Sequence, residues 1–213
     1  MTTRLALYNG ALVSFLGAKP LDDLTDDRAE RYALDDVWDR GAERAVLQMG
    51  QWNFAARSAR LEYESSITPT YGYRYAFEKP SDFVRTIAVC SDEYYRYPLR
   101  EYTDEIGYWW CDLTELYVRF VSDGNTYGGD LSAWPEDFAT MAQAYLALRV
   151  CKAVSAADKY DSLREEHKSL LSTARSTDAM EQPSPRQPQG SWSRARLAGG
   201  AHNDFGSKSR LIG

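Results

Sequence analysis

The sequence predicts an α+β protein, in which a four-helix domain carries an inserted antiparallel β-sheet or sandwich lobe and an extended C-terminal arm. Apolar residues recur at helical spacing near both ends of the chain, whereas residues 57–123 are rich in β-branched and aromatic side chains. We expect residues 1–55 and 133–178 to form the helical domain, 56–132 the β lobe and 179–213 the arm. A single α+β layer structure would fit the same order of elements.

The first helix is expected within residues 3–17. Glycine and proline, here Gly17 and Pro20, are typical of a helix end. The apolar residues of this segment fall on one helical face: Leu5, Tyr8, Leu12, Phe15 and Leu16.

A long second helix is expected over about residues 25–48. Thr25 is a plausible N-cap, and the acids that follow it suit the positive end of the helix dipole. The helix should end near Gly50, and the rings of Trp52 and Phe54 should pack where helix gives way to strand. Its apolar stripe consists of Ala29, Tyr32, Ala33, Val37, Trp38, Gly41, Ala45 and Met49.

Five or six strands are expected between residues 57 and 123. Aromatic residues alternate in "YGYRYAF" (71–77), and the segments 82–90, 105–112 and 115–122 are rich in β-branched and aromatic residues. Because the connections between them are short, the strands should be antiparallel.

Two further helices should follow, over about residues 131–154 and 158–178. Pro135 falls in a first-turn position, with acidic residues directly after it. The first of these helices has one apolar face, formed by Phe138, Met141, Ala142, Tyr145, Leu148 and Cys151. The second has a stripe formed by Tyr160, Leu163, His167, Leu170, Leu171 and Ala174.

Charge is distributed unevenly along the chain. The formal net charge is −6, which argues against a general nucleic-acid binder. Residues 183–213 hold five basic residues against one acid, a net charge of +4, which leaves −10 for the rest of the chain. An acidic body with a basic tail predicts that the tail docks onto an acidic surface.

The three cysteines, Cys90, Cys111 and Cys151, form no CxxC or Cys/His pattern, so a zinc site is not expected. We interpret them as reduced, mostly buried thiols of a cytosolic protein. The N-terminus lacks the pattern of a signal peptide, and no apolar run reaches the roughly 18 residues that a membrane helix needs.

We find no catalytic constellation, no cofactor motif and no metal site in the sequence, and predict that the chain is not an enzyme. The chain has two histidines: His167 falls in a helical stripe, and His202 lies in the arm, where nothing would hold it as a base. The sequence contains no GxSxG, GxxxxGK[ST] or GxGxxG motif. The Gly-rich "DGNTYGGD" lacks a phosphate-binding lysine and is interpreted as a loop.

Two short motifs in this order of elements resemble a known family. The second helix ends in a Trp-x-Phe motif, here Trp52 and Phe54, and the third follows a start of the type Pro135, Glu136 and Phe138. This plan resembles the tail tubular protein A family, which are head-tail adaptors (connectors) of short-tailed bacteriophages.

The resemblance covers roughly residues 3–175, and the arm sequence has no close match to a family motif. It implies a ring, commonly a dodecamer, beneath the portal protein in the virion at the head-tail interface. Its partners would be the portal, neighbouring copies and the next tail protein, of the nozzle or tail-terminator type. It implies no membrane and no specific DNA binding, since genomic DNA would only pass through the channel. The protein would be made in the cytoplasm of the bacterial host.

The arm is expected to provide the binding residues for the portal or a neighbouring subunit. Its isolated apolar and basic side chains suit an extended segment that folds on binding. The candidates are Trp192, Arg194, Arg196, Leu197, Phe205, Arg210, Leu211 and Ile212.

An alternative function is a β-sandwich binding module that recognises carbohydrate or a host surface. Tyr and Trp rings could stack on sugars. That function would require solvent-exposed Trp109 or Trp110 in a concave groove.

Overall fold

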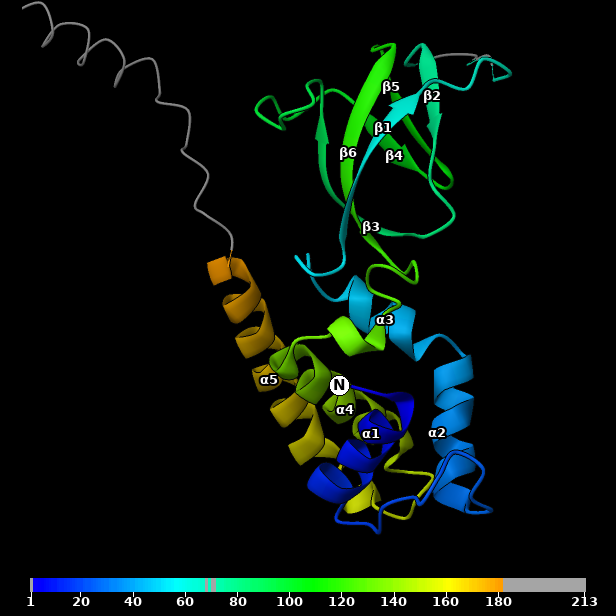
Figure 1. The fold of residues 1–213 in the computed structure, drawn as a ribbon, viewed down its shortest axis with the longest axis vertical. Coiled ribbons are helices and arrows are strands. Elements are labelled where there is room, and N and C mark those ends of the chain that lie inside the picture. Colours follow the sequence, from blue (N-terminus) through cyan, green and yellow to red (C-terminus); the bar gives the residue numbers. More distant parts are fainter. Residues whose placement is uncertain (1, 68, 70–71, 182–213) are drawn as a thin grey trace, which may run out of the picture. The chain divides into compact units, whose positions relative to one another are not determined.

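The computed structural model describes residues 2–67, 69 and 72–181, and shows the predicted α+β class (Figure 1). Within these residues there are five α-helices and two three-stranded antiparallel sheets. The α-helices are α1 (Arg4–Gly10), α2 (Ala29–Asp39), α3 (Ala42–Gln48), α4 (Glu136–Val150) and α5 (Tyr160–Glu181). A π-helical segment η1 (Ala11–Leu16) and two 3₁₀ turns, η2 (Leu131–Ala133) and η3 (Ala157–Lys159), complete the helical elements.

The N-terminal helix has the expected ends. Thr3 caps α1, because its hydroxyl accepts a hydrogen bond from the backbone N–H of Ala6 at 3.2 Å. The helical conformation continues without a break from α1 into η1 and ends at Gly17, whose φ of 68° is left-handed.

The long helix predicted for residues 25–48 is wrong in two respects. It begins only at Ala29, and Thr25 instead bonds Asp23 in a turn. It is also interrupted at Gly41, which has a φ of 88°, so that α2 and α3 are separate helices. Because a left-handed residue cannot continue a right-handed helix, the glycine ends one element and begins the next.

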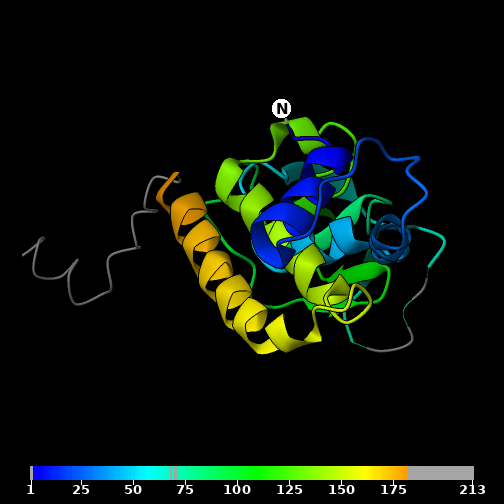
Figure 2. The same cartoon turned by 90° about the horizontal axis from the view of Figure 1, so that it is seen from below.

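The helix α4 lies at the centre of the helical elements and is buried on more than one face. Pro135 is its N-cap rather than a first-turn residue, and Glu136 and Asp137 occupy its first turn. Helices α1, α2 and α5 all contact it, and Figure 2 shows α5 running along it. Its buried residues are Phe138, Ala139, Met141, Ala142, Ala144, Leu146, Ala147 and Val150. The sequence predicted one apolar face for this helix, whereas the structure buries residues on more than one face.

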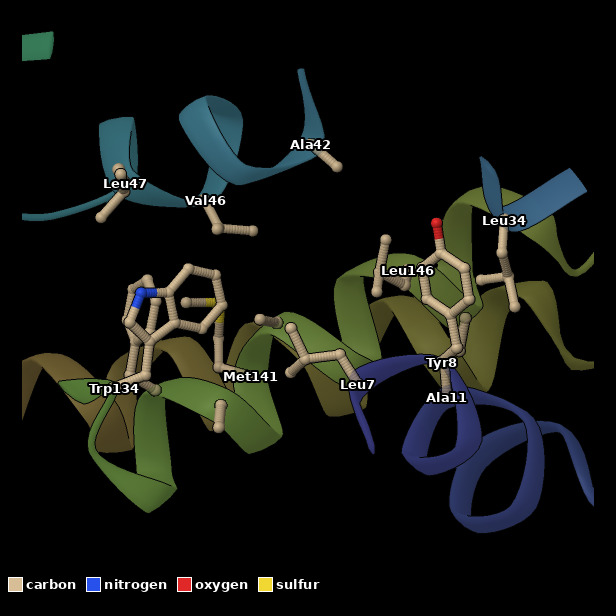
Figure 3. Packing of buried hydrophobic residues seen from close by; sticks show 14 of the residues in the cluster. Leu7, Tyr8, Ala11, Leu34, Ala42, Val46, Leu47, Trp134, Met141 and Leu146 are labelled. Carbon is tan, nitrogen blue, oxygen red and sulfur yellow. The ribbon is translucent and has the colours of Figure 1, made fainter. Parts of the chain in front are cut away.

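The core between these helices is continuous. Figure 3 shows Trp134 and Met141 facing Val46 and Leu47 of α3, while Tyr8 of α1 lies near Leu34 and Leu146. Tyr8 is fully buried, and its hydroxyl donates to Asp35 at 3.0 Å, which satisfies the polar end of the ring.

The β lobe contains six strands in two sheets, all paired antiparallel as predicted. One sheet has the order β1-β6-β3 and the other β2-β5-β4. The strands are β1 (Ala56–Glu62), β2 (Tyr75–Glu78), β3 (Phe83–Cys90), β4 (Thr103–Glu105), β5 (Tyr108–Cys111) and β6 (Glu115–Ser122).

The strand expected from "YGYRYAF" begins only at Tyr75, since Gly72 has a φ of 87° and Tyr73 precedes the ladder. Residue 71 of this stretch lies outside the described residues. A tight turn at Ile106 and Gly107 joins β4 to β5, and the φ of Gly107 is 86°.

The two sheets enclose a second hydrophobic cluster, separate from that of the helices. Its fully or almost fully buried members are Phe77, Val89, Trp109, Cys111, Leu116, Val118 and Phe120. Alternate residues of β5 and β6 supply most of it, as expected for strands with one face toward a core.

Candidate interaction sites

The arm residues predicted from the sequence as binding residues all lie outside the described residues. This applies to Trp192, Arg194, Arg196, Leu197, Phe205, Arg210, Leu211 and Ile212. Their role therefore stays a prediction, and the candidate sites below are formed by the described residues.

The two motifs on which the family resemblance depends meet in one aromatic cluster. The ring of Phe138 lies 4.7 Å from Trp52, 4.8 Å from Phe54 and 4.7 Å from Trp134, centroid to centroid, with edge-to-face geometry. Trp52 and Phe54 follow α3 and precede β1, so the expectation that their rings pack between helix and strand is confirmed.

The polar atoms of this aromatic cluster are satisfied by backbone carbonyls. The indole N–H of Trp52 donates to Leu47 at 3.1 Å, and that of Trp134 donates to Gly128 at 2.7 Å. Gly128 lies in the "DGNTYGGD" segment, and a Cβ there would come within 2.9 Å of Leu47. The segment is therefore a packed connection between β6 and α4, which agrees with its interpretation as a loop.

A small notch lies beside the aromatic cluster at the end of α5. Trp52, Phe54 and Phe138 line it on one side, and Asp178 and Glu181 on the other. The backbone N–H of Asn53 donates a hydrogen bond to the carboxylate of Asp178 at 2.8 Å. The pKa of Asp178 is raised, mainly because the carboxyl group is partly buried. The free volume of about 20 Å³ is too small for a ligand larger than water.

Ion pairs connect the helical elements to the β lobe. Arg44 of α3 pairs with Asp123 and donates to the carbonyl of Phe83, and Arg85 of β3 donates to the carbonyl of Gln48 at 3.0 Å. One of these contacts joins two side chains and two join a side chain to a backbone carbonyl, so α3 is tied to the start of β3 and to the residue that follows β6.

A second ion pair stabilises the base of the β lobe. Arg57 of β1 contacts both carboxylate oxygens of Asp82 at 2.7 Å, and the hydroxyl of the buried Ser122 donates to the same carboxylate. Burial alone would raise the pKa of Asp82, but the bonds from Ser122 and Arg57 outweigh it and lower that pKa below its ordinary value.

Within the β lobe, Trp109 is fully buried and cannot stack on a sugar. Its indole N–H lies 3.2 Å from the hydroxyl of Thr86 and 3.2 Å from the carboxylate of Asp104. The ammonium group of Lys79 contacts Asp104 as well and donates to the carbonyl of Glu105 at 2.7 Å. These groups form a polar network between the two sheets.

On the opposite face of β5, Tyr108 and Trp110 remain partly exposed. Their rings lie 6.0 Å apart, and the indole N–H of Trp110 is buried and has no hydrogen-bond partner among the described residues, so only other parts of that ring are exposed. Of the two tryptophans expected to mark a sugar-binding groove, Trp110 is therefore the one left in a position to contact a ligand.

An open groove of about 420 Å³ lies between the end of β1 and the connection from β2 to β3. Glu62, Glu64 and Glu78 line it together with Leu61 and Pro80. The ammonium group of Lys79, which also borders the groove, is held by Asp104 and Glu105 instead. The groove therefore combines three carboxylates with an apolar wall. Sequence reasoning missed it, because Glu62 and Glu78 belong to strands of different sheets and are brought to one groove only by the fold.

Two turns of the β lobe expose large tyrosine or isoleucine side chains. Tyr94 and Tyr97 are 68% and 69% exposed in the turn between β3 and β4, and Ile106 is fully exposed at the β4–β5 turn. The turn between β3 and β4 has the sequence "SDEYYRYP" (91–98), and its exposed tyrosines make it a candidate contact surface.

Some reactive side chains of the described body are buried at least in part. His167 of α5 packs against Tyr145 of α4 at 5.8 Å, its Nε2 is buried with no hydrogen-bond partner among the described residues, and burial lowers its pKa. Cys90, Cys111 and Cys151 are buried free thiols, as predicted. No group of three or more His, Cys, Asp or Glu side chains in the described residues could hold a metal ion.

No protein-family model matches the chain, and a search of curated proteins finds no match. Among the described helices, none has both the length and the apolar character needed to cross a bilayer.

Proposed function

We propose that this chain is a structural head-tail adaptor of a bacteriophage, which forms a ring beneath the portal, continues the DNA channel and provides the attachment surface for the tail. The observation that carries the proposal is the meeting of the two resemblance motifs. Trp52 and Phe54 contact Phe138 although more than 80 residues separate them in the chain.

The way in which the two lobes are joined supports a structural role. Arg44 and Arg85 tie α3 to β3, and Arg57 with Asp82 stabilises the neighbouring strand ends. A subunit that transmits force between head and tail needs such a stiff connection.

The acidity of the body supports a channel function. A charge of −10 outside residues 183–213, repeated around a ring, would give the channel a strongly negative potential. Such a wall repels the phosphate backbone, so DNA would slide past rather than bind.

The proposal is tested by expressing the chain together with the portal protein of the same phage. We expect the two to co-purify as a particle in which electron microscopy shows a ring of chain copies on one end of the portal. A folded chain that does not associate with an assembled portal would exclude the adaptor role.

The predicted role of the arm is tested by removing residues 182–213. Residues 1–181 form one compact unit with their own hydrophobic clusters, so the truncated chain should remain folded and soluble. It should fail to join the portal, whereas the full chain should join it. Truncated chain that still joins the portal with normal affinity would show that the arm is dispensable.

A carbohydrate-binding module is the second candidate, and the partly exposed pair Tyr108 and Trp110 favours it. If this pair binds sugar, oligosaccharides should quench tryptophan fluorescence in the full chain and not in a Trp110→Ala variant. The adaptor proposal expects no such response to any sugar tested.

A further inference from the structure

The acidic groove of the β lobe has the size and the chemistry to bind an extended basic peptide. Its volume of about 420 Å³ is several times that of one side chain, and it is open to solvent. Its three lining carboxylates come from different places in the chain: Glu62 ends β1, Glu64 follows that strand, and Glu78 ends β2.

The carboxylates of the groove are largely without basic partners within the described residues. Arg60 reaches Glu62 only at 3.9 Å, because its guanidinium is held by Glu115 at 2.6 Å. Glu64 accepts a backbone hydrogen bond from Ser66 at 3.1 Å, which leaves its charge uncompensated. Three negative charges beside an apolar wall favour a ligand with both cationic and apolar side chains.

One segment of the chain has this pattern. In "SWSRARL" (191–197) large residues alternate with small ones up to position 196, so that Trp192, Arg194 and Arg196 share one side of an extended backbone. Arginines two residues apart in an extended strand are separated by about 7 Å, and Glu62 and Glu64 are likewise two residues apart along the chain where β1 ends.

We infer that residues 192–196 of the arm bind in the acidic groove of a neighbouring copy. Arg194 and Arg196 pair with Glu62, Glu64 and Glu78, and the ring of Trp192 lies against Leu61 and Pro80. Each copy presents one groove and one arm, so the contact is heterologous and repeated contacts close a ring. The 32 residues after Glu181 span up to about 105 Å when extended, enough to reach an adjacent copy.

This inference rests on the proposed ring, because it names the contact that joins neighbouring copies. Its test uses the chain without the portal, so the two can fail separately. A chain that joins the portal but shows no arm-to-groove contact would contradict the inference alone.

The test is disulfide trapping between two variants of the full chain. One carries Ser81→Cys, at the groove, and the other carries Ser193→Cys, in the arm; neither substitution removes a charge. The native cysteines are buried, so they should not react. In the control pair, the second chain carries Ser169→Cys, on the exposed side of α5, in place of Ser81→Cys.

We expect the groove pair to form mixed dimers about tenfold faster than the α5 control, because docking raises the local thiol concentration. Adding Glu62→Gln, Glu64→Gln and Glu78→Gln to the groove chain should abolish this advantage, as should about 1 M salt. A matched loss of three charges elsewhere, Asp158→Asn with Glu165→Gln and Glu166→Gln, should leave the advantage intact.

Equal rates for the groove and control positions would overturn the inference, as would a groove advantage that survives the three Gln substitutions. A single chain that carries both Ser81→Cys and Ser193→Cys settles which copy supplies the arm. Crosslinked dimers and larger species support a neighbouring copy, whereas disulfide formation confined to monomers would overturn that assignment.

Discussion

Truncation of Phe138 tests the aromatic cluster on which the proposed function depends. Phe138 is 1% exposed and contacts the rings of Trp52, Phe54 and Trp134 at under 5 Å. Phe138→Ala removes the transfer free energy of a buried ring and leaves a cavity, which costs about 3–5 kcal/mol in comparable cores. The three edge-to-face contacts each add about 0.5–1.5 kcal/mol beyond burial, so the upper half of that range is expected.

A loss of about 4 kcal/mol should be visible in urea unfolding followed by circular dichroism. With a slope near 2 kcal/mol per M, typical of a domain of this size, the midpoint should fall by about 2 M. The corresponding drop in Tm is about 10 °C.

Two control variants separate packing from composition. Phe138→Leu keeps an apolar side chain at the site and should lose clearly less, whereas Tyr94→Ala removes a ring that is 68% exposed and should change stability by less than about 0.5 kcal/mol. If Phe138→Ala costs less than about 1.5 kcal/mol, the rings do not form a tightly packed junction and the reasoning fails.

Three further substitutions test polar groups of the body. Folding lowers the pKa of Asp82, so the ionised carboxylate contributes its full stabilisation above about pH 4 and loses it as the pH falls through the lower folded-state pKa. The difference in free energy of unfolding between wild type and Asp82→Asn, measured in urea, should therefore narrow only below about pH 4. Burial lowers the pKa of His167, so as the pH falls the histidine is protonated in the unfolded chain before it is protonated in the folded chain. The free energy of unfolding should therefore decline below about pH 6.5. His167→Gln should remove this decline when unfolding is measured as a function of pH. Lys79→Met leaves the carboxylate of Asp104 without its cation and should cost about 1–3 kcal/mol in thermal unfolding. Adding Asp104→Asn should restore part of that loss, and a purely additive double variant would show that the pair does not interact.

The element types could be predicted from residue spacing because each depends on local periodicity. Period-two segments such as 115–122 became strands, and the stripes with helical spacing became helices. The break at Gly41 was missed because a glycine in a helical stripe also fits a continuous helix. A Cβ added to Gly41 would meet no atom of the described residues within 4 Å, apart from those of its chain neighbours. The positive φ, and not a lack of space, is therefore the reason that glycine is favoured at this position.

The candidate sites could be predicted less well than the elements. The acidic groove needs Glu62 and Glu78 from different strands, and no sequence pattern relates residues across that gap. The two tryptophans of β5 could not be distinguished by type either. Trp109 became core and Trp110 stayed partly exposed because adjacent strand residues point to opposite faces, and only the packed lobe defines which face is inside.

The sequence by itself determined the order and kind of the elements and an acidic body followed by a basic segment. These properties are sums over neighbouring residues and need no knowledge of contacts. The tertiary structure decided that α4 is buried on several sides and that Trp52, Phe54, Trp134 and Phe138 form one cluster. Such contacts join residues far apart in the chain, and they are set by how the helices and sheets exclude water from one another, which no local pattern encodes.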